Sequence, residues 1–374
     1  MRKLSVVCLL LFCICSLARG QAPSGASAGR VRTYYIAADE VDWDYTPSGK
    51  DVIHDEPYHF EGAPMSKGAL HPNAAVYRKA LFREYTDASF QTLKPRSAAW
   101  THLGILGPLI RAEVGDTIKI TFKNNTSQAA SLHPHGVLYT KSSEGAAYQD
   151  GTSGADKADD AVPPGATYTY TWLVPERAGP TEHEASSAFW VYHSHVDEGS
   201  DINSGLIGPI IITRRGMARE DGSPKDVDRE FVVQFGLYDE HLSRYWDVNL
   251  KRIYGDPKKY DGSNSAVHDY HHFFTINGYL DGNGEMMVMH EGERVRWYVF
   301  ANPNEQEAWD IHTAHWHGQT VVIGHMRTDM VMLTPMMSAV ADMTPDNPGI
   351  WLLHCHMPGH FGAGMRTRFQ VVAK

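Results

Sequence analysis

The stretch Pro348-Gly349-Ile350-Trp351-Leu352-Leu353-His354-Cys355-His356 lies close to the end of this 374-residue sequence. The apolar run that opens it predicts a buried β-strand. Because side chains two apart on a strand point to the same side, the two histidines share one face and Cys355 points to the other. His360 and Met365 follow within ten residues. A thiolate, an imidazole and a thioether are three of the four ligands of a blue copper site, so the stretch predicts a further histidine ligand elsewhere.

The start of the chain predicts a secretory signal peptide over residues 1–20. Arg2 and Lys3 precede an apolar run over residues 6–17, and Ala18-Arg19-Gly20 resembles a cleavage site. The run is too short to span a membrane, so we expect a secreted, extracellular protein with no membrane span. Cys355 is then the only cysteine of the mature chain. A free thiol outside the cell is liable to oxidise, which favours a metal-bound cysteine over an inert buried one.

The charge balance of the chain excludes one class of partner. There are 34 basic and 44 acidic residues, and the predicted signal peptide contains three of the basic residues and none of the acidic ones. We therefore expect no binding to nucleic acid. Overlapping N-glycosylation sequons start at Asn124 and Asn125, and both are not easily used together.

The chain contains a tandem repeat. In the first unit, residues 109–114 and 117–122 read as strands around a turn, and His133-Pro134-His135-Gly136 follows. In the second unit, residues 291–299 match that turn and strand, and His315-Trp316-His317-Gly318 matches the histidine motif. Regular strand spacing without a convincing amphipathic helix predicts an all-β fold of two β-sandwiches. We expect domains at residues 21–220 and 221–374.

Histidine pairs mark both units. The four His-x-His pairs are His133/His135, His193/His195, His315/His317 and His354/His356. Residues two apart on a strand are about 6.6 Å apart, so paired imidazoles reach neighbouring metal ions better than one shared ion. Eight imidazoles on strand faces serve no packing purpose, and each ring nitrogen needs a partner. The pairs therefore predict a metal cluster, whereas His54, His241 and His290 are expected to be surface or hydrogen-bonded residues.

Together with residues 104–113, 192–197 and 204–209, these motifs resemble those of the multicopper oxidases of the ceruloplasmin and hephaestin branch. That family is built of six cupredoxin domains, which are Greek-key β-sandwiches. This chain resembles a two-domain form in which one unit matches the first domain of the family and the other the last. Ser194 stands where the first unit would need a type 1 cysteine, so only the second unit should hold blue copper.

The resemblance also implies the ligand set. The type 1 copper ligands would be His312, Cys355, His360 and Met365. The type 2 copper ligands would be His133 and His315. The ligands of the binuclear type 3 site would be His135, His193, His195, His317, His354 and His356. Asp150 resembles an acidic residue beside the type 2 copper and is our candidate proton relay, although Asp150-Gly151 also suits a plain turn.

The function implied by this resemblance is that of a secreted multicopper oxidase. It would oxidise a reductant one electron at a time through Cys355 and reduce dioxygen to water with four electrons. Ferrous iron is the reductant that the resemblance favours, and cuprous ion or a phenol is the alternative. A non-catalytic, copper-binding extracellular or matrix protein is a second class of function. A copper nitrite reductase fits less well, because its single type 2 copper has no use for the extra histidine pairs.

Two positions depart from the ferroxidases of this branch. Gly359 stands in place of an acidic residue before the second type 1 histidine, and Phe274 in place of an iron-site histidine; Asp269 and the His271-His272 pair could compensate. The second unit holds 11 of the 14 methionines, and soft thioethers suit Cu(I). We expect most of Met326, Met330, Met332, Met336 and Met337 to fill gaps in the core.

The resemblance finally implies a homotrimer. In six-domain relatives the copper cluster lies between the first and last domains, which meet because the ring of domains closes. Three two-domain chains can close the same ring head to tail. Each cluster would then combine the first-unit histidines of one chain with the second-unit histidines of the next.

Overall fold

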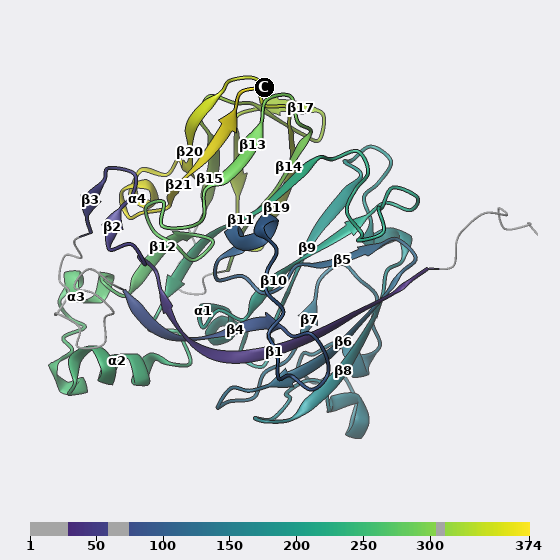
Figure 1. Cartoon of the computed structure of the whole chain (residues 1–374). Helices are drawn as coiled ribbons and strands as arrows, with labels where there is room; N and C mark the ends of the chain where they lie inside the picture. The colour runs from purple at the N-terminus through teal and green to yellow at the C-terminus, as the bar shows by residue number, and fades with distance from the viewer. Residues whose placement is uncertain (1–28, 59–74, 304–310) are drawn as a thin grey trace, which may run out of the picture.

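The computed structural model describes residues 29–58, 75–303 and 311–374 (Figure 1). The predicted signal peptide lies outside the described residues. The predicted all-β fold is confirmed, since the described chain forms two β-sandwiches, each made of two facing sheets. A small ribbon of β2 (Lys50–Asp51) and β3 (Glu56–Pro57) lies outside them.

The first sandwich contains sheets of order β4-β1-β6-β8 and β5-β10-β9-β7. Its strands are β1 (Val31–Asp44), β4 (Val76–Glu84), β5 (Ile110–Glu113), β6 (Thr117–Asn124), β7 (His133–Pro134), β8 (Thr167–Leu173), β9 (Ser187–His193) and β10 (Ile207–Thr213). The second contains sheets of order β12-β11-β14-β19-β16-β17 and β13-β21-β20-β15-β18. Its strands are β11 (Arg229–Asp239), β12 (His272–Ile276), β13 (Met287–His290), β14 (Val295–Ala301), β15 (His312–Trp316), β16 (Val321–Ile323), β17 (Met326–Thr328), β18 (Met330–Leu333), β19 (Ser338–Met343), β20 (Gly349–Cys355) and β21 (Arg366–Val372).

The two sandwiches repeat one topology. In each sandwich, the first long strand pairs in parallel with a neighbour in its sheet: β1 with β6 in the first and β11 with β14 in the second. In each facing sheet, a parallel pair is followed by two antiparallel strands that carry the histidine motifs: β5-β10-β9-β7 in the first and β13-β21-β20-β15 in the second. The exact division of the chain at residue 220 stays a prediction.

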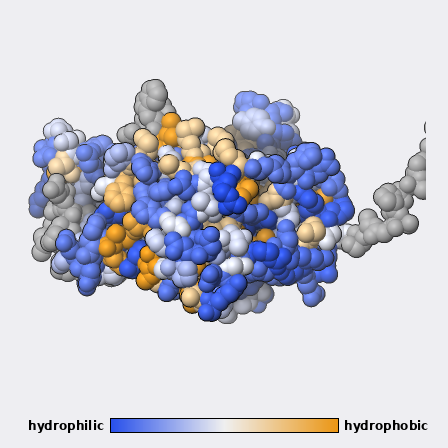
Figure 2. Space-filling model, turned by 90° about the horizontal axis from the view of Figure 1, so that it is seen from above, coloured by the Kyte–Doolittle hydropathy of each residue, from blue (hydrophilic) through white to orange (hydrophobic). Residues whose placement is uncertain are grey.

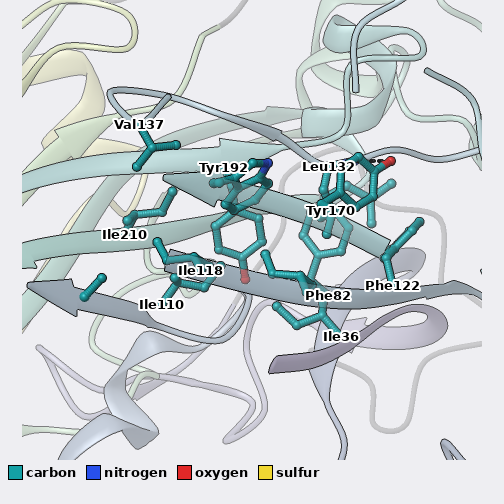
Figure 3. Close-up of a cluster of buried hydrophobic side chains, with 14 of the residues drawn as sticks. Ile36, Phe82, Ile110, Ile118, Phe122, Leu132, Val137, Tyr170, Tyr192 and Ile210 are labelled. Carbon is teal, nitrogen blue, oxygen red and sulfur yellow. Dashed lines mark hydrogen bonds between the residues drawn. The ribbon is translucent and has the colours of Figure 1, made fainter. Parts of the chain in front are cut away.

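Alternating residues build the first core. On β6 the buried apolar positions are Ile118, Ile120 and Phe122, with more exposed residues between them, as the sequence pattern predicts. Figure 3 shows Ile118 and Phe122 among the apolar side chains that meet Tyr192 of β9 between the two sheets. Tyr192 points inward, so its neighbour His193 is left to the outer face.

Shared apolar clusters join the two sandwiches. One contains Phe189 and Ile211 of the first unit with Tyr298 and Phe300 of the second. A buried ion pair also crosses the boundary, with Arg111 Nη2 at 2.6 Å from Glu230 Oε2. This packing fixes the two sandwiches relative to each other.

Helical segments lie between the strands. The α-helices are α1 (Glu198–Asn203), α2 (Trp246–Tyr254), α3 (Ser265–Asp269) and α4 (Pro358–Gly362), and the 3₁₀ helices are η1 (Ala98–Leu103), η2 (Lys141–Ser143), η3 (Gly154–Lys157), η4 (Glu176–Ala178) and η5 (Pro257–Lys259). The expectation of no amphipathic helix is wrong for α2, which buries Leu250 and Ile253 on one face. Two apolar residues three apart are too short a pattern to be recognised in the sequence.

The surface of the described part is mixed. Figure 2 shows apolar areas among hydrophilic residues on the face seen from above. Within the described ranges, no helix combines the length and apolar character needed to cross a membrane. Of the two sequon asparagines, Asn124 is buried and its side-chain amide donates to two backbone carbonyls, whereas Asn125 is exposed.

Candidate metal centres

The strand β20 has two chemically different faces. Leu353 and Cys355 point into the core of the second sandwich, as the sequence predicts. On the antiparallel neighbour β15, His315 is opposite His354 and Ala314 is opposite Cys355. His312 and Cys355 are therefore on the inner side of this sheet, and the histidine pairs are on its outer side.

The inner group has the donor atoms of a copper site. Cys355 Sγ lies 3.9 Å from His312 Nδ1 and 3.6 Å from His360 Nδ1, and the two Nδ1 atoms are 3.2 Å apart. An ion held at about 2.0–2.3 Å by each of these atoms would be compatible with those separations. The Met365 side chain is fully buried in the same core, and its backbone N–H donates to the His360 carbonyl at 3.0 Å. The sulfur and nitrogen donors thus suit copper, which prefers thiolate, thioether and imidazole ligands.

The electrostatics of the inner group favour a thiolate. Burial of Cys355 raises its pKa, but hydrogen bonds with His312 and His360 more than offset this and lower the pKa to about 6. The Thr313 backbone N–H also points to Sγ, at 3.4 Å. A thiolate is the form of cysteine that binds a metal.

The outer face of the second sandwich carries four imidazoles. His317 Nε2 lies 2.9 Å from His354 Nε2. His315 Nδ1 contacts the Asp329 carbonyl at 3.0 Å, and His354 Nδ1 contacts the Cys355 carbonyl at 2.8 Å. When Nδ1–H donates to a carbonyl, Nε2 is left as the metal-binding atom. The ring of the exposed His356 is 5.2 Å from that of His315.

The first sandwich repeats this arrangement. His135 Nε2 lies 3.1 Å from His193 Nε2. His133 Nδ1 contacts the Glu144 carbonyl at 2.7 Å, and His193 Nδ1 contacts the Ser194 carbonyl at 3.0 Å. The His195 ring is 5.1 Å from that of His133. Each carbonyl contact has a counterpart at the equivalent histidine of the second sandwich, so the sequence repeat extends to the orientation of the rings.

Burial keeps several of these imidazoles neutral. It lowers the pKa of His193 to about 3, and that of His135 and His354 to about 4. Neutral imidazole is the form that binds metal ions, so no proton has to be displaced at neutral pH.

The two outer groups remain separate. Ligand atoms within 4.8 Å of one another occur as His133/His135/His193 and as His315/His317/His354, and no such group in the described part of the chain mixes histidines of the two sandwiches. In the described part of one chain, the outer histidines therefore form two separate groups. His195 and His356 lie at the margins of their groups.

The place of a type 1 site in the first sandwich is filled by a polar network. Ser194 Oγ donates to Asp201, which also forms an ion pair with Arg244. Ser131 N–H donates to Ser194 Oγ at 3.1 Å. The expectation that this unit holds no blue copper stays a prediction.

The candidate relay Asp150 is engaged by cations. Its carboxylate lies 2.9 Å from Lys157 Nζ and 3.1 Å from Lys141 Nζ, and it accepts from the Thr152 N–H in a turn at 2.9 Å. Hydrogen bonds from Thr152 and Lys157 lower the pKa of Asp150 far below its ordinary value. Its role as a relay stays a prediction.

A carboxylate that the sequence reasoning missed is closer to the histidines. Glu198 Oε2 lies 3.4 Å from His195 Nε2, and Glu198 Oε1 lies 3.8 Å from His193 Nε2. Glu198 is the first residue of α1, three positions after His195. That spacing, combined with a helical turn after the strand, was the signal available in the sequence.

The positions that depart from the ferroxidase pattern surround the inner group. The Phe274 ring lies 4.7 Å from the His360 ring and covers it. Gly359 is exposed, and a Cβ built there has no atom within 4 Å. Asp269 is exposed, whereas His271 is buried and hydrogen bonded to the hydroxyls of Tyr77 and Tyr254.

The expectation for the methionines is wrong. Only Met336 of the five packs against a core cluster. The exposed fractions are 64% for Met326, 37% for Met330, 63% for Met332 and 55% for Met337. Met326 lies on β17, Met330 and Met332 lie on β18, and Met337 directly precedes β19.

Comparisons with known proteins agree with this geometry. Two family models described as Multicopper oxidase match residues 84–216 and 255–374, together more than half of the chain. Ferroxidase HEPHL1 of Homo sapiens is 41% identical over 373 residues, which are 99% of this chain and 31% of that protein. Hephaestin of Rattus norvegicus is 38% identical (97% of this chain, 30% of that protein), and ceruloplasmin of the same species is 37% identical (91% and 32%). The chain thus spans about 30% of the length of these relatives.

Solved structures support the fold. A multicopper oxidase named mgLAC has a TM-score of 0.57 at 19% identity, and a blue copper oxidase from Nitrosomonas europaea has a TM-score of 0.56 at 18% identity. Both matches cover 91% of this chain and 86% of the other. The two sandwiches are accordingly of the cupredoxin type.

Proposed function

Because this chain belongs to the multicopper oxidase family, we propose that it is an oxidase that takes single electrons from a small reductant and passes them to dioxygen. Copper bound at type 1, type 2 and type 3 sites would supply the one-electron redox chemistry and the binding of oxygen. The observation that carries the proposal is the two-faced strand β20, on which Cys355 joins an inner Cys/His group to an outer group of histidines.

We assign the inner group to type 1 copper and the outer groups to the cluster. His312, Cys355 and His360 would bind type 1 copper, with Met365 as the axial ligand. As the resemblance implies, His133 and His315 would bind type 2 copper, and the other six outer histidines would bind the type 3 pair. Soft thiolate and thioether ligands occur only on the inner side, which supports this assignment.

The residues of the chain provide a short path for electrons. An electron that enters at Cys355 Sγ passes along the side chain and backbone of one residue to its carbonyl oxygen. That oxygen is 2.8 Å from His354 Nδ1. The path consists of covalent bonds and one hydrogen bond, and it leads directly to an outer histidine.

Protons must also reach the outer histidines. Glu198 is the carboxylate closest to them in the first sandwich, at 3.4 Å from His195 Nε2. We propose that Glu198 holds a proton beside these histidines and supplies it to the oxygen that is reduced there. Asp150 is kept as a second candidate, which would act through the Lys141 and Glu144 side chains that lie beside it.

We further propose that three chains associate head to tail. Each sandwich offers four outer histidines, and the rigid contact between sandwiches keeps the two sets apart within a chain. Exposed apolar side chains border both sets: Leu138 follows the first-unit motif, and Met330 pairs with His315 across β15 and β18. Cyclic association would bury these residues and bring the two sets together.

The substrate we favour is ferrous iron, because the relatives include a protein named as a ferroxidase. A specific observation supports cuprous ion as the second candidate, namely the exposed thioethers of Met326, Met330, Met332 and Met337. A phenol is the third. We also propose secretion through the leader over residues 1–20, with Asn125 rather than the buried Asn124 as the glycosylation site.

The experiment that tests this function is steady-state kinetics on copper-loaded protein. Ferrous iron, cuprous ion and a phenol would be compared by oxygen uptake, and the absorption spectrum would be recorded on the same sample. We expect a blue thiolate band and oxygen uptake that is fastest with ferrous iron. A protein that binds copper and shows the blue band but consumes no oxygen with any donor would instead be a non-catalytic copper-binding protein.

A further inference from the structure

A fourth group of imidazoles lies outside the predicted copper sites. It consists of His241, directly after β11, His268 of α3 and His272, the first residue of β12. One ring nitrogen from each lies within 4.8 Å of the other two. All three side chains are partly buried. The copper sites proposed above use none of these residues.

The three rings are packed against one another. The His241 and His268 rings are stacked at 4.4 Å with 15° between their planes. The His272 ring stands edge-on to both, at 4.8 Å from His268 and 5.4 Å from His241. Stacked imidazoles gain little from each other, whereas three imidazoles arranged around one ion each gain a strong bond.

A buried carboxylate lies beside the group. Asp239 is 2% exposed, and its Oδ1 lies 2.7 Å from His241 Nδ1 and 3.3 Å from His272 Nε2. A carboxylate that holds a histidine in one orientation is a common feature of metal sites, and its negative charge offsets the charge of a bound dication. Tyr260 Oη lies 2.6 Å from the other nitrogen of His241, Nε2, and this contact would be exchanged for the metal bond when the ion binds.

The separations fit a single metal ion after small movements. Nitrogens at about 2.1 Å from one tetrahedral zinc ion are about 3.4 Å apart, so a separation of up to 4.8 Å has to close by up to about 1.4 Å, through rotation of the imidazole rings and movement of α3. The same 4.8 Å limit selects the three histidine-containing groups that the sequence predicts as copper ligands. His268, on a helix of five residues, and the surface-exposed Asp269 beside it can move without disturbing the core.

We propose that His241, His268 and His272 bind one divalent transition-metal ion of the zinc and copper(II) class, with Asp239 as the charge-compensating carboxylate. Three neutral imidazoles favour these borderline ions over calcium or magnesium, which prefer oxygen ligands. The site is separate from the type 1 group but close to it. His272 and Phe274 are two apart on β12 and share a face, and the Phe274 ring covers His360 at 4.7 Å.

Zinc titration of the full-length, copper-loaded protein tests the site, because the copper sites are then occupied. Isothermal titration calorimetry of the wild type should show one zinc ion bound per chain. His268→Ala should lose this ion or bind it at least about 10-fold more weakly. His290→Ala is the matched control, since His290 is also an exposed histidine beside a carboxylate, with Nδ1 at 3.3 Å from Glu293 Oε1. It should bind zinc like the wild type.

Two results would overturn the proposal. One is a wild type that binds no zinc and also holds no more copper per chain than His268→Ala does, and the other is a His268→Ala protein with unchanged stoichiometry and affinity. X-ray absorption at the zinc edge on the wild-type protein provides a check that needs no variant. It should show about three imidazole ligands, and a shell made only of oxygen would exclude the site.

Discussion

Replacing Cys355 with serine should block electron entry while leaving the fold and the outer histidines intact. The serine oxygen would lie in a fully buried position, but it would not lack partners, because the Thr313 N–H and two imidazoles already face that point. We expect the free energy of unfolding to fall by about 1 kcal/mol, because the hydrogen bonds to the serine oxygen have a less favourable geometry than those to the sulfur, and one hydrogen bond contributes about that much. The first sandwich supports this, since it accommodates the buried Ser194 at the equivalent position.

The Cys355→Ser protein should therefore unfold only about 2–4 °C below the wild type. It should lose the blue band and about one copper ion per chain. Oxygen uptake should fall to the rate of autoxidation of the reductant, because no thiolate remains to accept the electron. Differential scanning calorimetry, copper analysis and oxygen uptake on the same preparation measure all three. A colourless Cys355→Ser protein that still oxidises its substrate at a rate near that of the wild type would refute electron entry through this residue.

Three further predictions concern protons, iron and acid stability. Glu198→Gln should slow oxygen reduction at least about 10-fold, as expected for the loss of a proton donor, and Asp150→Asn should slow it less. If Asp150→Asn slows oxygen reduction as much or more, Glu198 is not the main proton donor. Gly359→Asp should raise kcat/KM for ferrous iron and leave a phenol nearly unchanged, because the open space at Gly359 accepts a carboxylate near His360; an iron site elsewhere is indicated if kcat/KM does not rise. Burial lowers the pKa of His102 from its ordinary 6.5 to about 4, so the unfolded chain takes up a proton between these values and the native chain does not. Its contribution to stability, about 3 kcal/mol, is present above pH 6.5 and is lost as the pH falls towards 4. His102→Gln should therefore lose less stability than the wild type over this range in urea titrations, and an identical pH dependence would contradict the assignment.

The sequence predicts those parts of the protein that depend on local patterns. Alternation of apolar residues is sufficient to place β6, and the apolar run before His354 is sufficient to place β20. The two faces of β20 follow from the pleat of a strand alone. The inner group of His312, Cys355 and His360 comes together as the resemblance implies.

Features that depend on the tertiary fold were not predicted. His241 and His272 are far apart in sequence and meet because β11 and β12 are neighbours in one sheet, with Asp239 opposite His272. His241 was expected to be a surface or hydrogen-bonded residue rather than a metal ligand, and it is hydrogen bonded. Its place in the proposed metal group depends on that pairing and on α3. Exposure of Met332 likewise depends on its strand lying at the edge of a sheet.

The central claim is that a complete site forms only between two chains, and co-expression of two variants tests it most directly. His135→Ala removes a histidine of the first sandwich, and His317→Ala removes one of the second, so each variant alone should be inactive with an intact type 1 site. In mixed head-to-tail trimers, random association gives about one quarter of the interfaces an intact histidine from each side. We expect the co-expressed protein to recover about a quarter of the wild-type oxygen uptake. Two results would show that the site is not shared between chains. One is that the mixed assemblies remain inactive, and the other is that wild-type protein shown by light scattering to be a monomer is fully active.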